Sequence, residues 1–209
     1  MFLFITFEGG EGSGKSTQAR ALHQRLLRMG IPVVLTHEPG GTPLGSRLRR
    51  WLKGKGENEK SEIDPQTELL LFNASRAQLV SQVIRPALES GSIVICDRFA
   101  ESTIAYQGYG RGLALDLIEA ANHIATQGLR PDLIVLLDIP VEQGLARKRL
   151  SDRFEKESLA FHQRVRRGYL GMAQKDPQRW FVVDASLPKK EVQRLIWERV
   201  QQLLPQALQ

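Results

Sequence analysis

The chain has 209 residues, 42% of them hydrophobic and 25% charged, and a formal net charge of +6 at pH 7. These values are typical of one globular domain, and the single cysteine, Cys96, excludes a disulfide within the chain. The basic balance suits a polyanionic partner, either a nucleotide or a nucleic acid. No apolar stretch is long enough to span a membrane. The first apolar run is short and lacks a basic leader, so we expect a cytoplasmic protein without a signal peptide.

Apolar runs alternate with helical patterns along the chain. The predicted strands are Phe2–Phe7, Pro32–Thr36, Ser92–Cys96, Leu133–Asp138 and Arg179–Val183. The third and fourth runs are continuous and rich in β-branched residues, as expected of strands that are buried on both faces. The alternation predicts an α/β fold, in which a five-stranded parallel sheet is covered by helices on both faces. Ligands then gather at the carboxyl ends of the strands.

A Gly-rich stretch follows the first predicted strand and opens a helix. It comprises Gly9, Gly10, Glu11, Gly12, Ser13, Gly14, Lys15, Ser16 and Thr17, which have the G-x-x-x-x-G-K-[ST] spacing of a P-loop. Glycine lets successive backbone N–H groups point at phosphate oxygens, and the helix N-terminus also favours anions. We expect Lys15 to reach the β- and γ-phosphates of ATP and the Ser16 hydroxyl to ligate Mg²⁺. A plain Gly-rich turn with an exposed lysine is the alternative.

The next segments combine a turn with a long helical pattern. Residues 37–45 hold two prolines and three glycines, which predict a shaped turn, and Thr42 is expected to cap a helix that begins at Pro43. Residues 65–88 are predicted to form one helix, with Phe72 and Arg76 on the same face. A core phenylalanine beside a surface arginine is the simpler interpretation. The pair could instead stack on a base and hydrogen-bond it.

Polar residues follow the two central strands. Asp97 follows the third strand and Asp138 ends the fourth, and either carboxylate could be the acidic partner of the P-loop that helps to hold Mg²⁺. Arg98 is a further candidate ligand for phosphate. In the segment 101–112, hydroxyl and amide groups suited to reading a base edge are offered by Ser102, Tyr106 and Gln107. For Gly108–Gly112, a Gly-rich loop is the simpler interpretation.

The remaining patterns are two apolar stripes and one basic cluster. Helical stripes are formed by Leu117, Ile118, Ala121, Ile124 and Ala125, and by Val192, Leu195, Ile196, Val200 and Leu203. A basic cluster in the segment 144–155 comprises Arg147, Lys148, Arg149 and Arg153. A solvated charged face usually explains such a run. A mobile lid that brings arginine to a migrating phosphoryl group and excludes water is the functional alternative.

Taken together, these motifs resemble the thymidylate kinase family of P-loop kinases. The resemblance covers nearly the whole chain and rests on the P-loop, Glu38-Pro39-Gly40-Gly41-Thr42, Asp97-Arg98-Phe99, residues 102–111 and Asp152-Arg153-Phe154-Glu155. It implies transfer of the ATP γ-phosphoryl group to dTMP, with Mg²⁺, giving dTDP and ADP. It also implies a homodimer that binds neither nucleic acid nor membrane. We expect residues 1–209 to form a single kinase domain with a short lid at about 144–155.

The resemblance assigns roles on the acceptor side. Glu11 would contact the 3′-hydroxyl of the dTMP sugar, Phe72 would stack on thymine, and Arg76 would hydrogen-bond the base. Arg98 would bind the dTMP phosphate. The other expected acceptor residues are Glu38, Pro39, Ser102, Tyr106 and Gln107.

The resemblance also assigns roles in phosphoryl transfer. Asp97 would act near Mg²⁺ together with Ser16, and Lys15 and Arg98 are expected catalytic residues. Gly12 stands where some members carry arginine, so lid arginines are expected to supply the catalytic charge. The first candidates are Arg149 and Arg153, and Arg147 is the next. Two features depart from the family pattern: the lid is a few residues short, and His37 replaces an arginine.

Two other functions fit parts of the sequence. The first is a nucleotide or nucleoside kinase with a different acceptor on the same fold. The second is a P-loop NTPase that acts with nucleic acid through the basic runs, and it would hydrolyse ATP without a nucleotide acceptor. This second function leaves the Tyr106-Gln107 segment unexplained.

Overall fold

The computed structural model describes residues 3–54, 63–147 and 152–205. Its strands are β1 (Leu3–Glu8), β2 (Val33–His37), β3 (Ile93–Asp97), β4 (Leu133–Asp138) and β5 (Trp180–Asp184). They form one parallel sheet in the order β2-β3-β1-β4-β5. The α/β prediction is confirmed. Four of the strands begin and end one residue later than predicted, so Glu8 and Asp97 are the last residues of β1 and β3.

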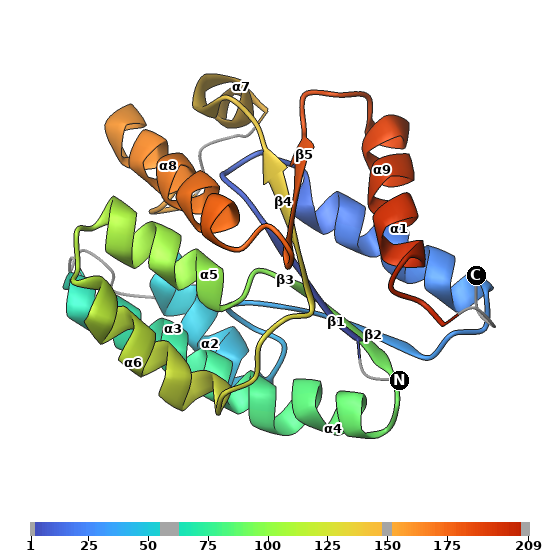
Figure 1. Ribbon diagram of the computed structural model, residues 1–209. Helices are drawn as coiled ribbons and strands as arrows, with labels where there is room; N and C mark the ends of the chain where they lie inside the picture. Colours follow the sequence, from blue (N-terminus) through green and yellow to red (C-terminus); the bar gives the residue numbers. More distant parts are fainter. Residues whose placement is uncertain (1–2, 55–62, 148–151, 206–209) are drawn as a thin grey trace.

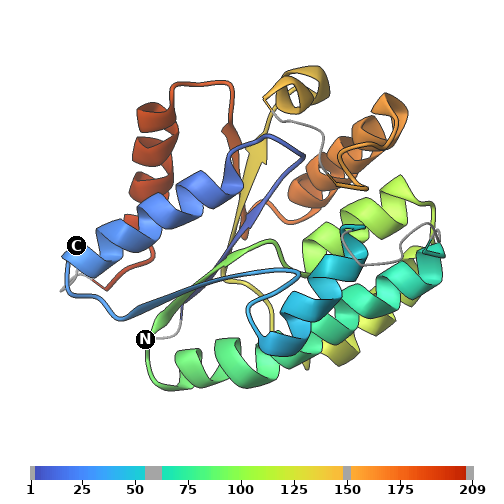
Figure 2. The same ribbon diagram turned by 180° about the vertical axis from the view of Figure 1, so that it is seen from behind.

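Helices cover both faces of the sheet, as Figure 1 and the reverse view in Figure 2 show. Helices α1 (Lys15–Arg28) and α9 (Lys189–Gln201) lie on one face. The opposite face carries α3 (Pro65–Leu79), α4 (Arg85–Glu89), α6 (Leu115–Thr126) and α8 (Leu159–Lys175). Successive side chains of β1 point to opposite faces: Leu3, Ile5 and Phe7 join the core with α1 and α9, and Phe4 packs on the other side. The central strand β1 is therefore buried on both faces.

The turn after β2 forms as the sequence predicts. Helix α2 spans Pro43–Leu52, and the Oγ1 atom of Thr42 accepts a hydrogen bond from the backbone N–H of Gly45 at 3.0 Å. This contact satisfies one of the unpaired N–H groups at the start of the helix, and Pro43 has no N–H to satisfy.

The predicted long helix runs from residue 65 to residue 89, but it is not uniform. Between α3 and α4 lies one wide π-helical turn, η1 (Val80–Ile84). Pro86 explains the wide turn, because proline lacks the N–H of a regular helical bond and its ring crowds the preceding turn.

Two sequence-based interpretations are wrong. The Gly-rich loop expected at Gly108–Gly112 begins only after Gly110, because α5 (Ala100–Thr103) continues into the π-helix η2 (Ile104–Gly110). Its glycines permit close packing rather than a loop: a Cβ on Gly108 would lie 2.6 Å from Leu115. The stripe on α6 is also not one buried face.

On α6 the apolar residues divide between two faces of the helix. Ile118 and Ala125 are buried, whereas Leu117 and Ile124 are 57% and 77% exposed. Among the described residues, no helix is both long enough and apolar enough to cross a lipid bilayer.

Candidate active site

A cleft of about 620 Å³ opens near the carboxyl ends of β1, β2 and β3. Most of the residues predicted for function line it. These are Glu11, Gly12, Gly14, Lys15, Ser16, Thr17, Glu38, Pro39, Phe72, Asp97, Arg98, Ser102, Tyr106 and Gln107. Gly9 and Gly10 lie beside a small neighbouring cavity on the other side of the P-loop. The cleft joins segments that are far apart in sequence, as the rule for parallel sheets requires.

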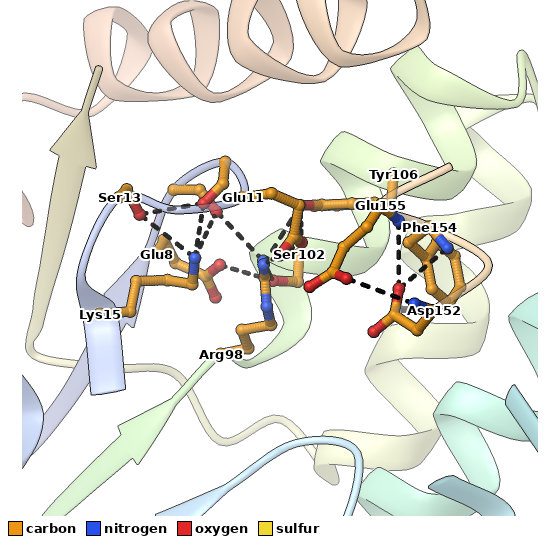
Figure 3. A network of polar contacts seen from close by, with 12 residues as sticks. Glu8, Glu11, Ser13, Lys15, Arg98, Ser102, Tyr106, Asp152, Phe154 and Glu155 are labelled. Atoms are coloured by element: carbon orange, nitrogen blue, oxygen red, sulfur yellow. Dashed lines mark hydrogen bonds and ion pairs between the residues drawn. The ribbon is translucent and has the colours of Figure 1, made fainter. Parts of the chain in front are cut away.

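Lys15 lies in the P-loop with its ammonium group turned onto the loop itself (Figure 3). Its Nζ donates to the carbonyl oxygens of Gly9 at 3.0 Å and Gly10 at 2.7 Å, and to Oγ of Ser13 at 3.2 Å. Burial is the main reason that the pKa of Lys15 falls to about 8, and the nearby positive charge of Arg98 acts in the same direction against the pull of Glu11. A phosphate group would supply the negative charge that this buried ammonium lacks.

Ser16 meets Asp97 across the cleft, and the Ser16 hydroxyl donates to Oδ2 of Asp97. The alternative carboxylate, Asp138, is paired with Arg166 at 2.7 and 2.8 Å. The structure therefore brings Asp97, and not Asp138, to the P-loop hydroxyl. Hydroxyl and carboxylate oxygens are hard ligands that Mg²⁺ prefers, and Mg²⁺ usually takes one or two protein ligands beside substrate phosphates. The Ser16–Asp97 pair fits that pattern.

Arg98 lines the cleft and has a strained backbone conformation. Its φ angle is 73°, in the left-handed region that costs a non-glycine residue about 1–2 kcal/mol. Its guanidinium donates to Oε1 of Glu11 at 2.7 Å and to the hydroxyl of Tyr106 at 3.1 Å. Strain that the surrounding contacts maintain is common at functional sites.

Glu8 and Tyr169 are buried residues that help to position Arg98, and the sequence analysis did not single them out. The carboxylate of Glu8 accepts from the N–H of Phe99 at 2.7 Å, from Ser102 at 2.6 Å and from the Tyr169 hydroxyl at 2.8 Å. Tyr169 and Ser102 in turn accept from Arg98 at 3.3 and 3.2 Å. Burial raises the pKa of Glu8, and the charge of Arg98 opposes that rise.

The sequence contained a signal for only one of these two residues. Glu8 ends the first strand, where the carboxyl-end rule directs attention. Tyr169 lies on α8 and reaches Glu8 across 161 positions of sequence. Such a long-range contact leaves no local spacing pattern by which it could be recognised.

Aromatic side chains form one wall of the cleft. The ring centroid of Phe154 lies 5.8 Å from that of Phe72 and 6.0 Å from that of Tyr106. All three residues line the cleft, and Gln107 lies beside them with its side chain almost fully buried. A flat base could stack against such a wall while an amide reads its edge.

Arg76 is placed differently from its predicted neighbours. It is buried and does not line the cleft, and its Nε donates to Glu38 at 2.8 Å. The other four N–H groups donate to Oδ1 of Asn73 and Asn122, the carbonyl of Phe99 and the hydroxyl of Thr103. All five donors therefore have protein partners. A hydrogen bond from Arg76 to a base would require one of these contacts to be shared or released.

The predicted lid arginines are spread over different contacts. Arg149 lies outside the described residues. Arg147 donates to the carbonyl of Ala185 at 3.0 Å and lines the cleft. Arg153 does not line the cleft, because its Nη2 lies 2.5 Å from Oε2 of the buried Glu68.

The residues around Arg153 form a compact turn. Oδ1 of Asp152 accepts from the backbone N–H groups of Phe154 and Glu155, both at 3.1 Å (Figure 3). Oδ2 of Asp152 pairs with Lys53 at 2.8 Å. This turn directs Phe154 into the aromatic wall of the cleft.

Known proteins show clear similarity to the chain. The sequence profile of the family described as Thymidylate kinase matches residues 7–196. The thymidylate kinase of Dehalococcoides mccartyi (strain CBDB1) is 52% identical over 98% of both chains, and that of Thermomicrobium roseum is 51% identical over 98% of this chain and 97% of the relative. The crystal structure of thymidylate kinase from Ehrlichia chaffeensis matches with a TM-score of 0.78 and 35% identity, over 95% of this chain and 98% of that one.

Proposed function

This chain belongs to the thymidylate kinase family and phosphorylates dTMP, and we propose that the transfer takes place in the cleft around Lys15 and Arg98. One observation carries this assignment: a P-loop lysine and a strained arginine line the same cleft, and both donate to the carbonyl oxygen of Gly9. Phosphoryl transfer depends mainly on positioning and charge neutralisation, so two neighbouring cations in one cleft are suited to it.

On the donor side, the P-loop would bind the phosphates of ATP through its backbone N–H groups and Lys15. The lysine would exchange its contacts with Gly9 and Gly10 for phosphate oxygens. Ser16 and Asp97 would hold Mg²⁺. When bound, this ion would neutralise the charge of the phosphates and help to orient them.

On the acceptor side, we assign the dTMP phosphate to Arg98 and the sugar 3′-hydroxyl to Glu11. Thymine would lie against Phe72, with Gln107 at the edge of the base. Ser102 and Tyr106 orient Arg98 through their hydroxyl groups. No general base is needed, because the attacking group is an anionic phosphate oxygen.

The remaining acceptor assignments concern Glu38, Pro39 and Arg76. Glu38 and Pro39 line the cleft and would shape the pocket. Arg76 does not line the cleft, and it positions Glu38 by donating a hydrogen bond to its carboxylate. A direct bond from Arg76 to the base stays a prediction. The lid at 144–155 and its catalytic arginines, Arg149 and Arg153, also stay predictions.

We further propose that the protein is a homodimer that packs through α3 and α6. These helices lie side by side, and each exposes large apolar side chains. Leu70 on α3 is 63% exposed, and Leu117 and Ile124 on α6 are 57% and 77% exposed. Clustered apolar exposure of this kind is typical of a surface that another chain covers.

A coupled assay of ADP release tests the proposed reaction. The enzyme is supplied with Mg-ATP and, in separate runs, dTMP, dUMP, thymidine, AMP, CMP or no acceptor. We expect strong release with dTMP, and dTDP as the identified product. Equal release without an acceptor would contradict a kinase and favour an ATPase, and a stronger response to another nucleotide would contradict the assigned acceptor.

A further inference from the structure

Glu68 is a buried carboxylate whose role the reaction above does not explain. It lies on α3, is fully buried and does not line the cleft. Its Oε1 accepts from Nε2 of Gln107 at 2.6 Å. Arg111 donates to both of its oxygens at 3.3 Å, and Arg153 donates to Oε2 at 2.5 Å. One buried acid thus connects two arginines with the amide that we place at the acceptor base.

These contacts determine which end of the Gln107 amide faces Glu68. The two ends of an amide are similar in size, so their hydrogen-bond partners decide the orientation. A carboxylate that is paired with two guanidinium groups can only accept hydrogen bonds. The NH₂ end of Gln107 must therefore face Glu68. The carbonyl oxygen of Gln107 is then the end of the amide that does not face Glu68. Gln107 lines the cleft together with Phe72 and Tyr106.

The orientation of this amide matters because pyrimidine bases differ at the same edge. Thymine and uracil present an N3–H donor next to the O4 acceptor. Cytosine presents the reverse pattern, with an N3 acceptor next to an amino donor. An amide whose carbonyl faces N3 matches thymine and uracil, whereas the flipped amide matches cytosine. A site with a buried polar group of the wrong kind rejects the mismatched ligand, since that group loses its partner.

We propose that Glu68 is a positioning residue that holds the Gln107 amide so that it accepts the N3–H of thymine and discriminates against dCMP. This inference rests on the proposed contact between Gln107 and the acceptor base. The two arginines fix the carboxylate in turn: Arg111 also pairs with Glu157 at 2.5 Å, and Arg153 stacks over the ring of Phe154 at 4.9 Å. Glu68 thereby connects base selection to the Asp152–Glu155 turn.

The test measures kcat/KM for dTMP, dUMP and dCMP in Glu68→Gln. This variant keeps the size of the side chain but lets it donate as well as accept, so the Gln107 amide can flip. We expect the dTMP:dCMP ratio to fall by about tenfold or more, in line with the loss of one buried hydrogen-bond match. The dTMP:dUMP ratio should not change, because these two bases share the same N3 edge. An equal loss for all three acceptors would show a merely structural role and overturn the proposal.

Glu157→Gln is the matched control. It alters the other acid partner of Arg111 while the Gln107–Glu68 bond stays intact, so neither ratio should change. If the dTMP:dCMP ratio falls equally in Glu157→Gln, general loosening around Arg111 explains the effect, and the proposal fails. Glu68→Asp keeps a group that only accepts, and it should retain the ratio even if kcat/KM is lower.

Gln107→Ala separates failure of this inference from failure of the proposed base contact. If the dTMP:dCMP ratio changes in Gln107→Ala but not in Glu68→Gln, Gln107 reads the base without Glu68, and only the inference fails. If it changes in neither variant, the base contact itself fails. Should Glu68→Gln not fold, ¹⁵N spectra of the wild-type enzyme decide. The proposal requires one slowly exchanging Gln107 amide proton both with and without dTMP, and rapid exchange of both protons would overturn it.

Discussion

Arg98 and Glu11 form an ion pair across the cleft, with Nη2 of the arginine 2.7 Å from Oε1 of the glutamate. One residue follows β3 and the other lies in the P-loop, 87 positions apart in the sequence. We assign them to opposite ends of the dTMP sugar, the 5′-phosphate and the 3′-hydroxyl. Acceptor binding would then draw the two side chains onto different groups of one ligand. The pair holds both side chains near the positions that the acceptor requires.

Replacing Arg98 should separate its catalytic charge from its backbone strain. Arg98→Ala and Arg98→Gly should both lose activity by at least about a hundredfold, because each removes the cation assigned to the acceptor phosphate. Glycine adopts positive φ without a penalty, so Arg98→Gly should be more stable than Arg98→Ala by about 1 kcal/mol. Steady-state kinetics and urea unfolding test the two expectations. Activity within severalfold of the wild type in either variant would disprove the catalytic assignment.

Asp97 and Asp138 offer a matched pair for the metal assignment. Asp97→Asn should raise the Mg²⁺ concentration that half-maximal activity requires, because it replaces the carboxylate beside Ser16 with a neutral amide. Asp138→Asn alters a carboxylate that pairs with Arg166, and it should leave the Mg²⁺ requirement unchanged. Titration of Mg²⁺ at fixed ATP measures both. The same Mg²⁺ requirement in Asp97→Asn and the wild type would contradict this role.

The buried ammonium of Lys15 should make stability depend on pH. Its pKa of about 8 in the fold lies below the ordinary value of 10.5, so between these values the unfolded chain binds more protons than the folded protein. The free energy of unfolding should therefore rise with pH across this window, by up to about 3 kcal/mol from this group. Below pH 8 the lysine is charged in both states, and its contribution is constant.

Lys15→Met isolates this contribution from those of the other titrating groups. The variant should lose nearly all activity. Relative to this variant, the wild type should gain stability as the pH rises from 8 to 10, which urea unfolding without nucleotide at several pH values would show. A constant difference between the two proteins would mean that Lys15 does not titrate in this range.

Gly12 and Gly144 bring the P-loop and α7 (Val141–Ala146) into close contact. A Cβ on Gly12 would lie 1.9 Å from the carbonyl oxygen of Gly144, and φ at Gly12 is +69°. Gly12→Ala should therefore lower stability by about 2 kcal/mol or more through strain and a backbone clash. A Cβ on Gly10 would meet nothing within 4 Å, so Gly10→Ala is the stability control. Equal melting temperatures for the two variants would contradict the close contact.

The dimer proposal predicts the effect of one surface charge. Ile124→Glu places a carboxylate on the exposed face of α6, where a partner would have to bury it without compensation. We expect the variant to sediment as a monomer while its helix content and melting behaviour stay close to those of the wild type. Glu119→Gln on the same helix is a mild control. A wild-type protein that sediments as a monomer would rule out the proposal.

The features that depend on local patterns could be predicted from the amino-acid sequence alone. Continuous apolar runs located the strands to within one residue, the P-loop spacing marked the start of α1, and Thr42 before Pro43 marked the start of α2. These features could be predicted because the period of a strand, the geometry of a phosphate loop and the capping of a helix each involve neighbouring residues.

The features that depend on distant partners could be recognised only in the folded chain. Asp97 and Asp138 each end a central strand, so the sequence does not distinguish them as metal ligands. In the fold, Asp97 contacts Ser16 of the P-loop, whereas Asp138 pairs with Arg166. Tyr169 and Glu68 escaped prediction for the same reason, since Tyr169 meets Glu8 across 161 positions and Glu68 meets Gln107 across 39. A buried polar group must find its hydrogen-bond partners wherever the folded chain brings them, and no local spacing records that choice.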